Sequence, residues 1–243
     1  MMRGRAIALF AAAVLAQHLM RASPPNAELQ RSAQEPRGGP LAVVVLLDVS
    51  RGSWPSRDLF NVREAVRTAL TASLRDGDRI AVGSISDRVV VPDALASMPT
   101  DIQPLLREPF DVSWGERHGN TPIWDAVDRS VGLLARAPSG ARRVVLLYTS
   151  GRPAGNVLSL PEVVARARVA RVAVHVVFRP TAQSRLEQHD STDVLWIRPD
   201  LLLRELTTGT GGVLVTADVL SSTGLRDVFA GMLSGARDRG PGH

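Results

Sequence analysis

The chain of 243 residues contains no cysteine and no lysine, and only 4% of its residues are aromatic. The absence of cysteine excludes disulfides, and it excludes a lipid anchor on a cysteine at a signal cleavage site. All 29 basic residues are therefore arginine, which explains a sequence pI of about 11.1 beside a formal net charge of only +5. The arginines are interleaved with Asp and Glu, and so dispersed a charge predicts no nucleic-acid partner.

The first 22 residues have the pattern of a secretory signal peptide. Arg3 and Arg5 form a basic start, and an apolar stretch follows over residues 6–16. That stretch is too short to span a bilayer as a helix, and a buried helix would leave it without a polar face. Cleavage is expected after Ala16 or Ala22. We therefore expect a secreted or periplasmic protein without a membrane span.

Residues 23–39 are rich in Pro, Ser and Gln and predict a flexible leader. Apolar runs then alternate with helical periods over residues 40–236, the predicted domain. Strands are expected at 41–47, 79–86, 89–91, 142–149, 171–178 and 213–216, and helices near 56–74, 102–107, 121–137, 161–170, 201–208 and 225–236. This order predicts an α/β fold, doubly wound, with helices on both faces of a mostly parallel six-stranded sheet that has one antiparallel edge strand. Residues 237–243 are expected to be a disordered tail.

Polar side chains follow the first strand, at the edge where open α/β sheets place their ligand sites. Asp48 and Ser50 resemble the first motif, Asp-x-Ser-x-Ser, of von Willebrand factor type A domains. Residues 119–126 (GNTPIWDA) resemble the second motif, with Thr121 as its ligand and the expected cap of the following helix. Residues 147–151 (LYTSG) resemble the third, with Ser150 where that family has Asp.

Two further stretches, 78–82 and 208–212, agree with the same family, so the resemblance covers about residues 40–236. It is strongest to the bacterial secreted group. The family's motifs build a metal-ion-dependent adhesion site that holds Mg²⁺, or Mn²⁺, and a carboxylate of the partner protein. Here the resemblance implies Asp48, Ser50, Thr121 and Ser150 as the ligands. Mg²⁺ prefers six oxygens and needs carboxylates for charge, whereas Gly52 lacks a hydroxyl and Ser150 lacks a carboxylate, so we expect Mg²⁺ binding to be weakened or lost.

Arginine and tryptophan residues lie beside these motifs. Arg51 and Arg152 could replace the charge of the metal and hold an acidic residue of a partner directly, because a guanidinium binds carboxylate through two hydrogen bonds. The alternative is that both are solvated loop residues. Trp54 and Trp114 are candidate partner contacts, since Trp is enriched at binding hot spots, or else local caps of the loops.

The sequence thus predicts a protein-binding module and no enzyme. One alternative is a scaffold of the same fold that binds nothing. Another is a serine hydrolase using Ser150, although a nucleophile elbow would need glycine at positions 148 and 152, which are Tyr and Arg.

Overall fold

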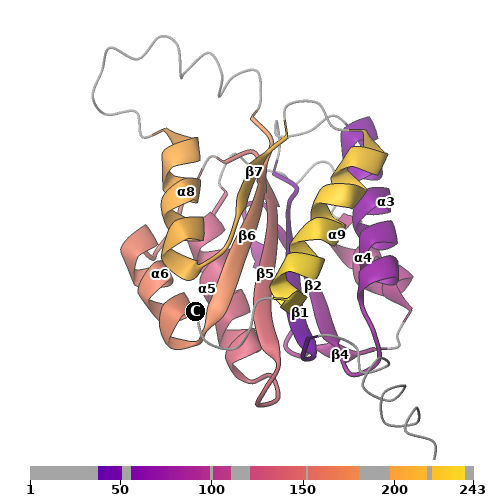
Figure 1. Cartoon of the computed structure of the whole chain (residues 1–243). Helices are drawn as coiled ribbons and strands as arrows, with labels where there is room; N and C mark the ends of the chain where they lie inside the picture. Colours follow the sequence, from indigo (N-terminus) through magenta and orange to yellow (C-terminus); the bar gives the residue numbers. More distant parts are fainter. Residues whose placement is uncertain are drawn as a thin grey trace, which may run out of the picture. The chain divides into compact units, whose positions relative to one another are not determined.

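The computed structural model describes residues 38–50, 56–98, 101–110, 121–151, 153–180, 198–217 and 221–238. Its centre is a seven-stranded sheet in the order β3-β2-β1-β5-β6-β7, with β4 also paired to β2 (Figure 1). The strands are β1 (Leu41–Asp48), β2 (Arg79–Ile85), β3 (Val89–Val90), β4 (Ala96–Ser97), β5 (Arg142–Thr149), β6 (Val172–Phe178) and β7 (Leu214–Thr216). The long strands are parallel, and β3 and β4 are antiparallel to β2. The predicted fold class is confirmed, with one short strand more than expected.

Strand β1 is the middle of the sheet and is buried along its whole length. Its alternate side chains enter two different apolar clusters, Leu41 and Val43 on one face and Ala42 and Val44 on the other. A strand covered on both faces needs a continuous apolar sequence, which is why the run from Leu41 carried so clear a signal.

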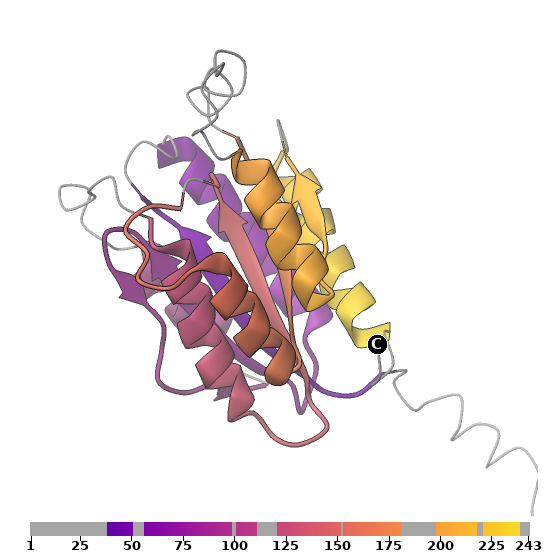
Figure 2. The same ribbon diagram turned by 90° about the vertical axis from the view of Figure 1, so that its left-hand side faces the viewer.

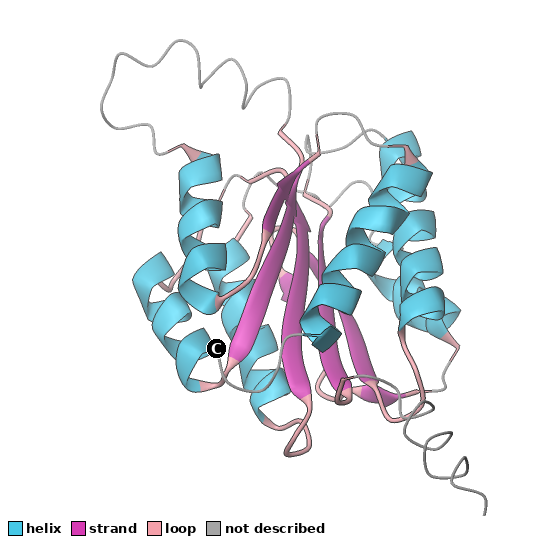
Figure 3. Cartoon of the chain, in the orientation of Figure 1, coloured by secondary structure: helices cyan, strands magenta, loops and turns pink. Residues whose placement is uncertain are grey.

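Helices cover both faces of the sheet (Figure 3). The first cluster includes residues of α3, α4 and α9, and the second includes residues of α5, α6 and α8. Their bounds are α3 (Ser56–Ser73), α4 (Ile102–Phe110), α5 (Ile123–Ala135), α6 (Leu160–Val169), α8 (Pro199–Thr210) and α9 (Ser222–Asp238). Figure 2 shows α5, α6 and α8 side by side in front of the sheet. Since α3 and α6 follow the ends of β1 and β5, their first turns face the carboxyl edge of the sheet, and the positive ends of their dipoles lie there.

Several boundaries differ from the sequence prediction, and one strand was missed. Helix α8 continues past Gly209 to Thr210, and left-handed Gly211 (φ 74°) caps it. The predicted tail begins too early, because α9 runs to Asp238 and Arg237 is buried. Strand β4 was missed because two residues carry no periodic pattern. The predicted signal peptide, residues 23–37 of the predicted leader, and the last five residues lie outside the described residues.

Gly212, one of the two glycines before β7, is required because the backbone of β6 lies very close to it. A Cβ at Gly212 would lie 1.8 Å from the main-chain oxygen of Val174. Any other residue there would push the chain away from β6, so the Thr-Gly-Gly stretch is needed to bring β7 into the sheet.

Candidate functional site

Asp48 ends β1 and is fully buried at the carboxyl edge of the sheet. Its Oδ1 accepts hydrogen bonds from the main-chain nitrogen of Ser50 (3.1 Å) and from the Ser50 hydroxyl (2.5 Å). Its Oδ2 accepts three more, from the hydroxyl of Thr149 (2.9 Å) and from the nitrogen and hydroxyl of Ser150 (both 3.1 Å). We call these four residues the Asp48 latch, because they join the loops that follow β1 and β5.

The register of the sheet creates the latch. Leu47 pairs with Tyr148 in the parallel ladder, so Asp48 and Thr149 leave neighbouring strands side by side. The Thr149 hydroxyl also accepts a hydrogen bond from the main-chain nitrogen of Gly151 (3.0 Å). Gly151 has φ 84°, and a Cβ there would lie 2.5 Å from the Phe178 ring, so the turn requires glycine.

Thr121 is buried but takes a different position from the one predicted. It forms a two-residue bridge with Ala154, with N···O distances of 3.1 and 3.0 Å. Helix α5 starts at Ile123 with Pro122 as its N-cap, so the prediction that Thr121 caps the helix is wrong. Two backbone hydrogen bonds hold Thr121 against the loop after β5, and among the described residues no hydrogen bond joins it to Asp48.

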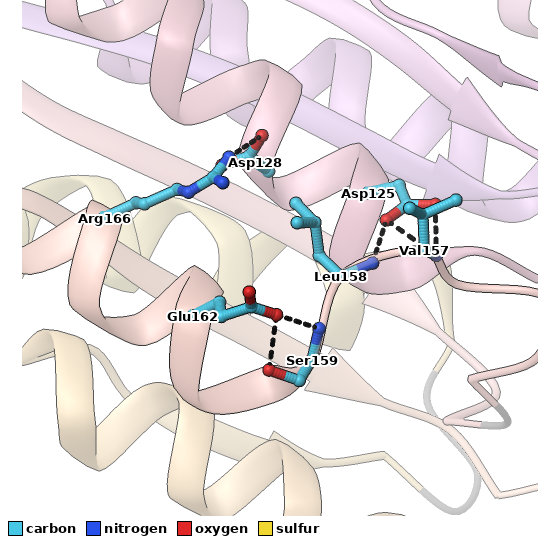
Figure 4. Close-up of polar contacts among 7 residues, drawn as sticks. All are labelled: Asp125, Asp128, Val157, Leu158, Ser159, Glu162 and Arg166. Carbon is cyan, nitrogen blue, oxygen red and sulfur yellow. Dashed lines mark hydrogen bonds and ion pairs between the residues drawn. The ribbon is translucent and has the colours of Figure 1, made fainter.

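The same loop is fastened to the first turn of α5. Asn156 Oδ1 accepts a hydrogen bond from the main-chain nitrogen of Trp124 (2.7 Å), one of the backbone donors at the helix start that have no partner within the helix. The Asp125 carboxylate accepts the nitrogens of Val157 (3.0 Å) and Leu158 (3.0 Å), as Figure 4 shows. These bonds fix the loop that begins at Ser150. Asp125, Asn156 and Thr149 were not among the predicted site residues. Asp125 belongs to the second motif, whereas no sequence pattern indicates Asn156.

The next segment, at the start of α6, is fixed by its own side chains. The nitrogen (2.8 Å) and hydroxyl (2.6 Å) of Ser159 donate to Glu162 Oε2 (Figure 4). These bonds lower the pKa of Glu162. Arg166 binds Asp128 across the two helices at 3.0 Å. These contacts hold α5 and α6 together and fix the start of α6 at the carboxyl edge, where the latch lies.

Beside the latch, on the opposite face of the sheet, Tyr148 is fully buried. Burial raises the pKa of its hydroxyl to about 12, and the guanidinium of Arg179 opposes the rise. Arg179 in turn binds Asp58 of α3 at 2.8 Å, and its backbone nitrogen donates to the Thr149 oxygen at 2.9 Å. The ion pair therefore ties the start of α3 to the ends of β5 and β6.

The predicted partner contacts Arg51, Trp54, Trp114 and Arg152 lie outside the described residues. Gly52 lies outside them as well. Trp124, for which packing was expected, is buried with 6% exposure.

The described residues fit a divalent cation poorly. They bring together Asp48, Ser50 and Ser150 but supply one carboxylate, both of whose oxygens accept hydrogen bonds. Within the described ranges, no three His, Cys, Asp or Glu side chains gather into a metal-binding group. A small dication that gives up its waters reluctantly needs more negative charge than this donor set provides.

The Ser150 hydroxyl donates a hydrogen bond to Asp48. His175, the one histidine of the described part, lies in β6, and its Nδ1 accepts a hydrogen bond from the Val213 nitrogen. The geometry thus gives Ser150 a hydrogen-bonding role.

No family model matches the sequence, and no curated protein matches it. Solved structures do match. One is a von Willebrand factor type A protein from Catenulispora acidiphila, with a TM-score of 0.59 at 16% identity over 82% of this chain and 43% of that one. The chain has the von Willebrand factor type A fold.

Two more structures of this fold are similar to the chain. Protein BatB from Bacteroides thetaiotaomicron matches with a TM-score of 0.56 at 16% identity, over 81% of this chain and 98% of that one. Proximal thread matrix protein 1 from the mussel byssus matches with a TM-score of 0.57 at 13% identity, over 82% of this chain and 48% of that one. The chain thus spans less than half of the first and third of these proteins. At these identities the likeness concerns the von Willebrand A fold alone.

Proposed function

We propose that this von Willebrand A domain is a secreted or periplasmic module that binds another protein at the carboxyl edge of its sheet. The observation that carries the proposal is the Asp48 latch. It holds together the two loops whose next residues are Arg51, directly after Ser50, and Arg152, directly after Gly151. Ser50 and Gly151, the described residues that precede these two arginines, are therefore both fixed by hydrogen bonds at the latch, and we expect a carboxylate of the partner to be bound beyond them. Arginine suits this task because its fork matches a carboxylate.

Proteins with this fold support the proposal by their own roles. Similar structures include the pilus adhesin SpaC from Lactobacillus rhamnosus GG, with a TM-score of 0.58 at 12% identity. The mussel matrix protein is also known with zinc in its adhesion motif. In the present chain the latch gives Asp48 five hydrogen bonds from hydroxyls and amides. We infer that Mg²⁺ or Mn²⁺ binding is weakened or lost and that binding proceeds without metal. Asp48, Ser50, Thr121 and Ser150 would then order the loops, and Arg51, Arg152, Trp54 and Trp114 would touch the partner.

The chain offers a direct test because it has no cysteine. Val157 is 90% exposed on the fastened loop, so Val157→Cys places a single photo-crosslinker at the carboxyl edge. We expect the labelled domain to crosslink one protein from the secreted fraction of its own organism, in the presence of EDTA. Arg51→Ala/Arg152→Ala should abolish the adduct, whereas Arg204→Ala/Arg226→Ala, with the same change of charge, should retain it. Retention in both variants would contradict the arginine-based proposal, and no adduct in the parent protein would favour the non-binding scaffold.

A further inference from the structure

Four arginines gather at the opposite, amino edge of the sheet. Arg143 at the start of β5 donates to the Ala170 oxygen (2.9 Å) and to the Ala137 oxygen (3.4 Å). These carbonyls lie just past the last residues of α6 and α5, so one guanidinium joins the C-terminal ends of two helices. Arg136 lies next to Ala137 in the chain, and Arg168 and Arg171 flank Ala170. We call Arg136, Arg143, Arg168, Val169 and Arg171 the arginine tip.

The charges of the tip are held in place but not neutralised. Arg136 donates to the main-chain oxygen of Asp93 (3.1 Å), and Arg143 also bonds only carbonyls. Ion pairs in the described part of the chain involve Arg67, Arg166, Arg179, Arg198, Arg226 and Arg237. None of the tip arginines is among them. A hydrogen bond to a neutral carbonyl leaves the full positive charge available to an external anion.

An exposed apolar side chain lies within this positive surface. Val169 ends α6 and is 87% exposed, with exposed Arg168 and Arg171 on either side. The turn is well ordered, since the nitrogens of Ala170 and Arg171 each donate back into the helix at 3.0 Å. Arg171 has a positive φ of 53°, which turns the chain sharply into β6.

We propose that the arginine tip is a docking surface for an anionic phospholipid bilayer. Basic residues near such a surface gain from its negative potential, about fivefold in affinity for each arginine. The central Val169 favours lipid over a nucleic acid, because an aliphatic side chain can enter the headgroup region, whereas single-stranded nucleic acids are bound with aromatic stacking residues that the tip does not contain. No described helix is long and apolar enough to cross a membrane. The proposed contact is made by side chains of the tip, and it leaves the carboxyl edge facing away from the bilayer.

The first experiment asks which end of the domain meets the membrane. Val169→Cys and Val157→Cys, each in the full chain, carry one environment-sensitive fluorophore on side chains of nearly equal exposure, 87% and 90%, at opposite edges. With vesicles of phosphatidylglycerol and phosphatidylcholine in about equal parts, the label at 169 should brighten and shift to the blue while the label at 157 stays unchanged. Equal responses, or none at 169, would overturn the proposal. The comparison is internal to the domain, so binding through residues 1–37 would not imitate it.

The second experiment measures vesicle affinity by co-sedimentation of the full chain. Arg168→Gln/Arg171→Gln should weaken binding about 25-fold, from about fivefold for each arginine. The matched control Arg198→Gln/Arg226→Gln removes two ion-paired arginines and equal charge, and should change affinity less than about twofold. Equal losses in the two variants would show an effect of net charge and overturn the proposal.

Two further arms separate the lipid from other anions. Free glycerol phosphate should not displace the vesicles, because the surface potential of a bilayer and the insertion of Val169 are absent from it. A duplex DNA oligonucleotide should bind more weakly than the vesicles at physiological salt. Tip-dependent binding to DNA with none to vesicles would refute the lipid assignment.

Discussion

Two buried carboxylates lie at opposite edges of the sheet and are satisfied in opposite ways. At the carboxyl edge, every donor that the described residues give to Asp48 is a hydroxyl or a backbone amide. At the amino edge, Asp78 binds the guanidinium of Arg237, with N···O distances of 3.2 and 2.5 Å, and accepts the nitrogens of Leu41 (2.7 Å) and Arg75 (2.8 Å). Both carboxylates are at most 1% exposed.

The pair of Asp78 and Arg237 serves the stability of the amino edge. Arg237 also donates to the carbonyls of Gly39 and Ser73, so one side chain fastens the last helix to the entry of β1 and to the end of α3. Gly38 is needed there, because a Cβ would lie 2.4 Å from the Arg237 oxygen. Around Asp78, two buried charges thus neutralise each other. At the carboxyl edge, the described residues join the loops after β1 and β5 through hydroxyls and backbone amides, which carry no charge.

The largest expected effect comes from breaking the pair at the amino edge. Arg237→Ala leaves a buried carboxylate without its cation and should lower the free energy of unfolding by about 3 to 5 kcal/mol. Urea denaturation measures the loss. Arg226→Ala removes the exposed pair with Asp227 and should cost under about 1 kcal/mol. A loss for Arg237→Ala no larger than that control would show that the edges do not differ as described.

At the carboxyl edge, Asp48→Asn should cost about 3 kcal/mol. Whichever way the amide points, its NH₂ group replaces an oxygen that accepts hydrogen bonds, so at least one buried donor of Ser50 or Ser150 loses its partner. The matched variant Asp200→Asn alters an exposed pair with Arg198 and should be nearly neutral. Stability of Asp48→Asn equal to that of the parent would mean that the latch does not hold the loops.

The sequence predicted part of this difference between the two edges and missed the contacts that leave no local pattern. The apolar run from Leu41 and the polar residues after it located β1 and Asp48, because burial on both faces and the strand end leave a local pattern. Arg237 was assigned to a disordered tail, since its partner Asp78 lies 159 residues away. Thr121 was placed as a helix cap because Pro122 suits a first turn, whereas the bridge with Ala154 is a tertiary contact without a local signal. Thr149 was passed over because the strand pattern explained it equally well.

Alkaline titration probes the carboxyl edge through one group. The chain has a single tyrosine, no lysine and no cysteine, so Tyr148 is the one side chain expected to lose a proton between pH 10 and 12. Its folded pKa of about 12 lies above the unfolded value of 10. The protonated Tyr148 hydroxyl therefore contributes about 2 to 3 kcal/mol to the free energy of unfolding. This contribution is complete below pH 10 and is lost as the pH rises toward 12. Denaturation at several pH values measures the loss, and ultraviolet absorbance of tyrosinate reports the pKa. Tyr148→Phe should show no such fall, and an equal fall in that variant would contradict the assignment.

The smallest expected effect concerns metal. Millimolar Mg²⁺ or Mn²⁺, added after EDTA, should move the thermal midpoint of the full chain by less than about 1 °C, because a ligand stabilises the native state only when its concentration exceeds its dissociation constant. The latch provides a single carboxylate for such an ion, and its hydroxyls already share their protons with that carboxylate. A clear rise that Asp48→Asn removes would contradict this expectation, since it would mean that the neutral donors of Ser50 and Ser150 can rearrange around a cation. In that case the carboxyl edge would bind its partner through the metal, and the Arg51→Ala/Arg152→Ala variant should keep its crosslink when Mg²⁺ replaces EDTA.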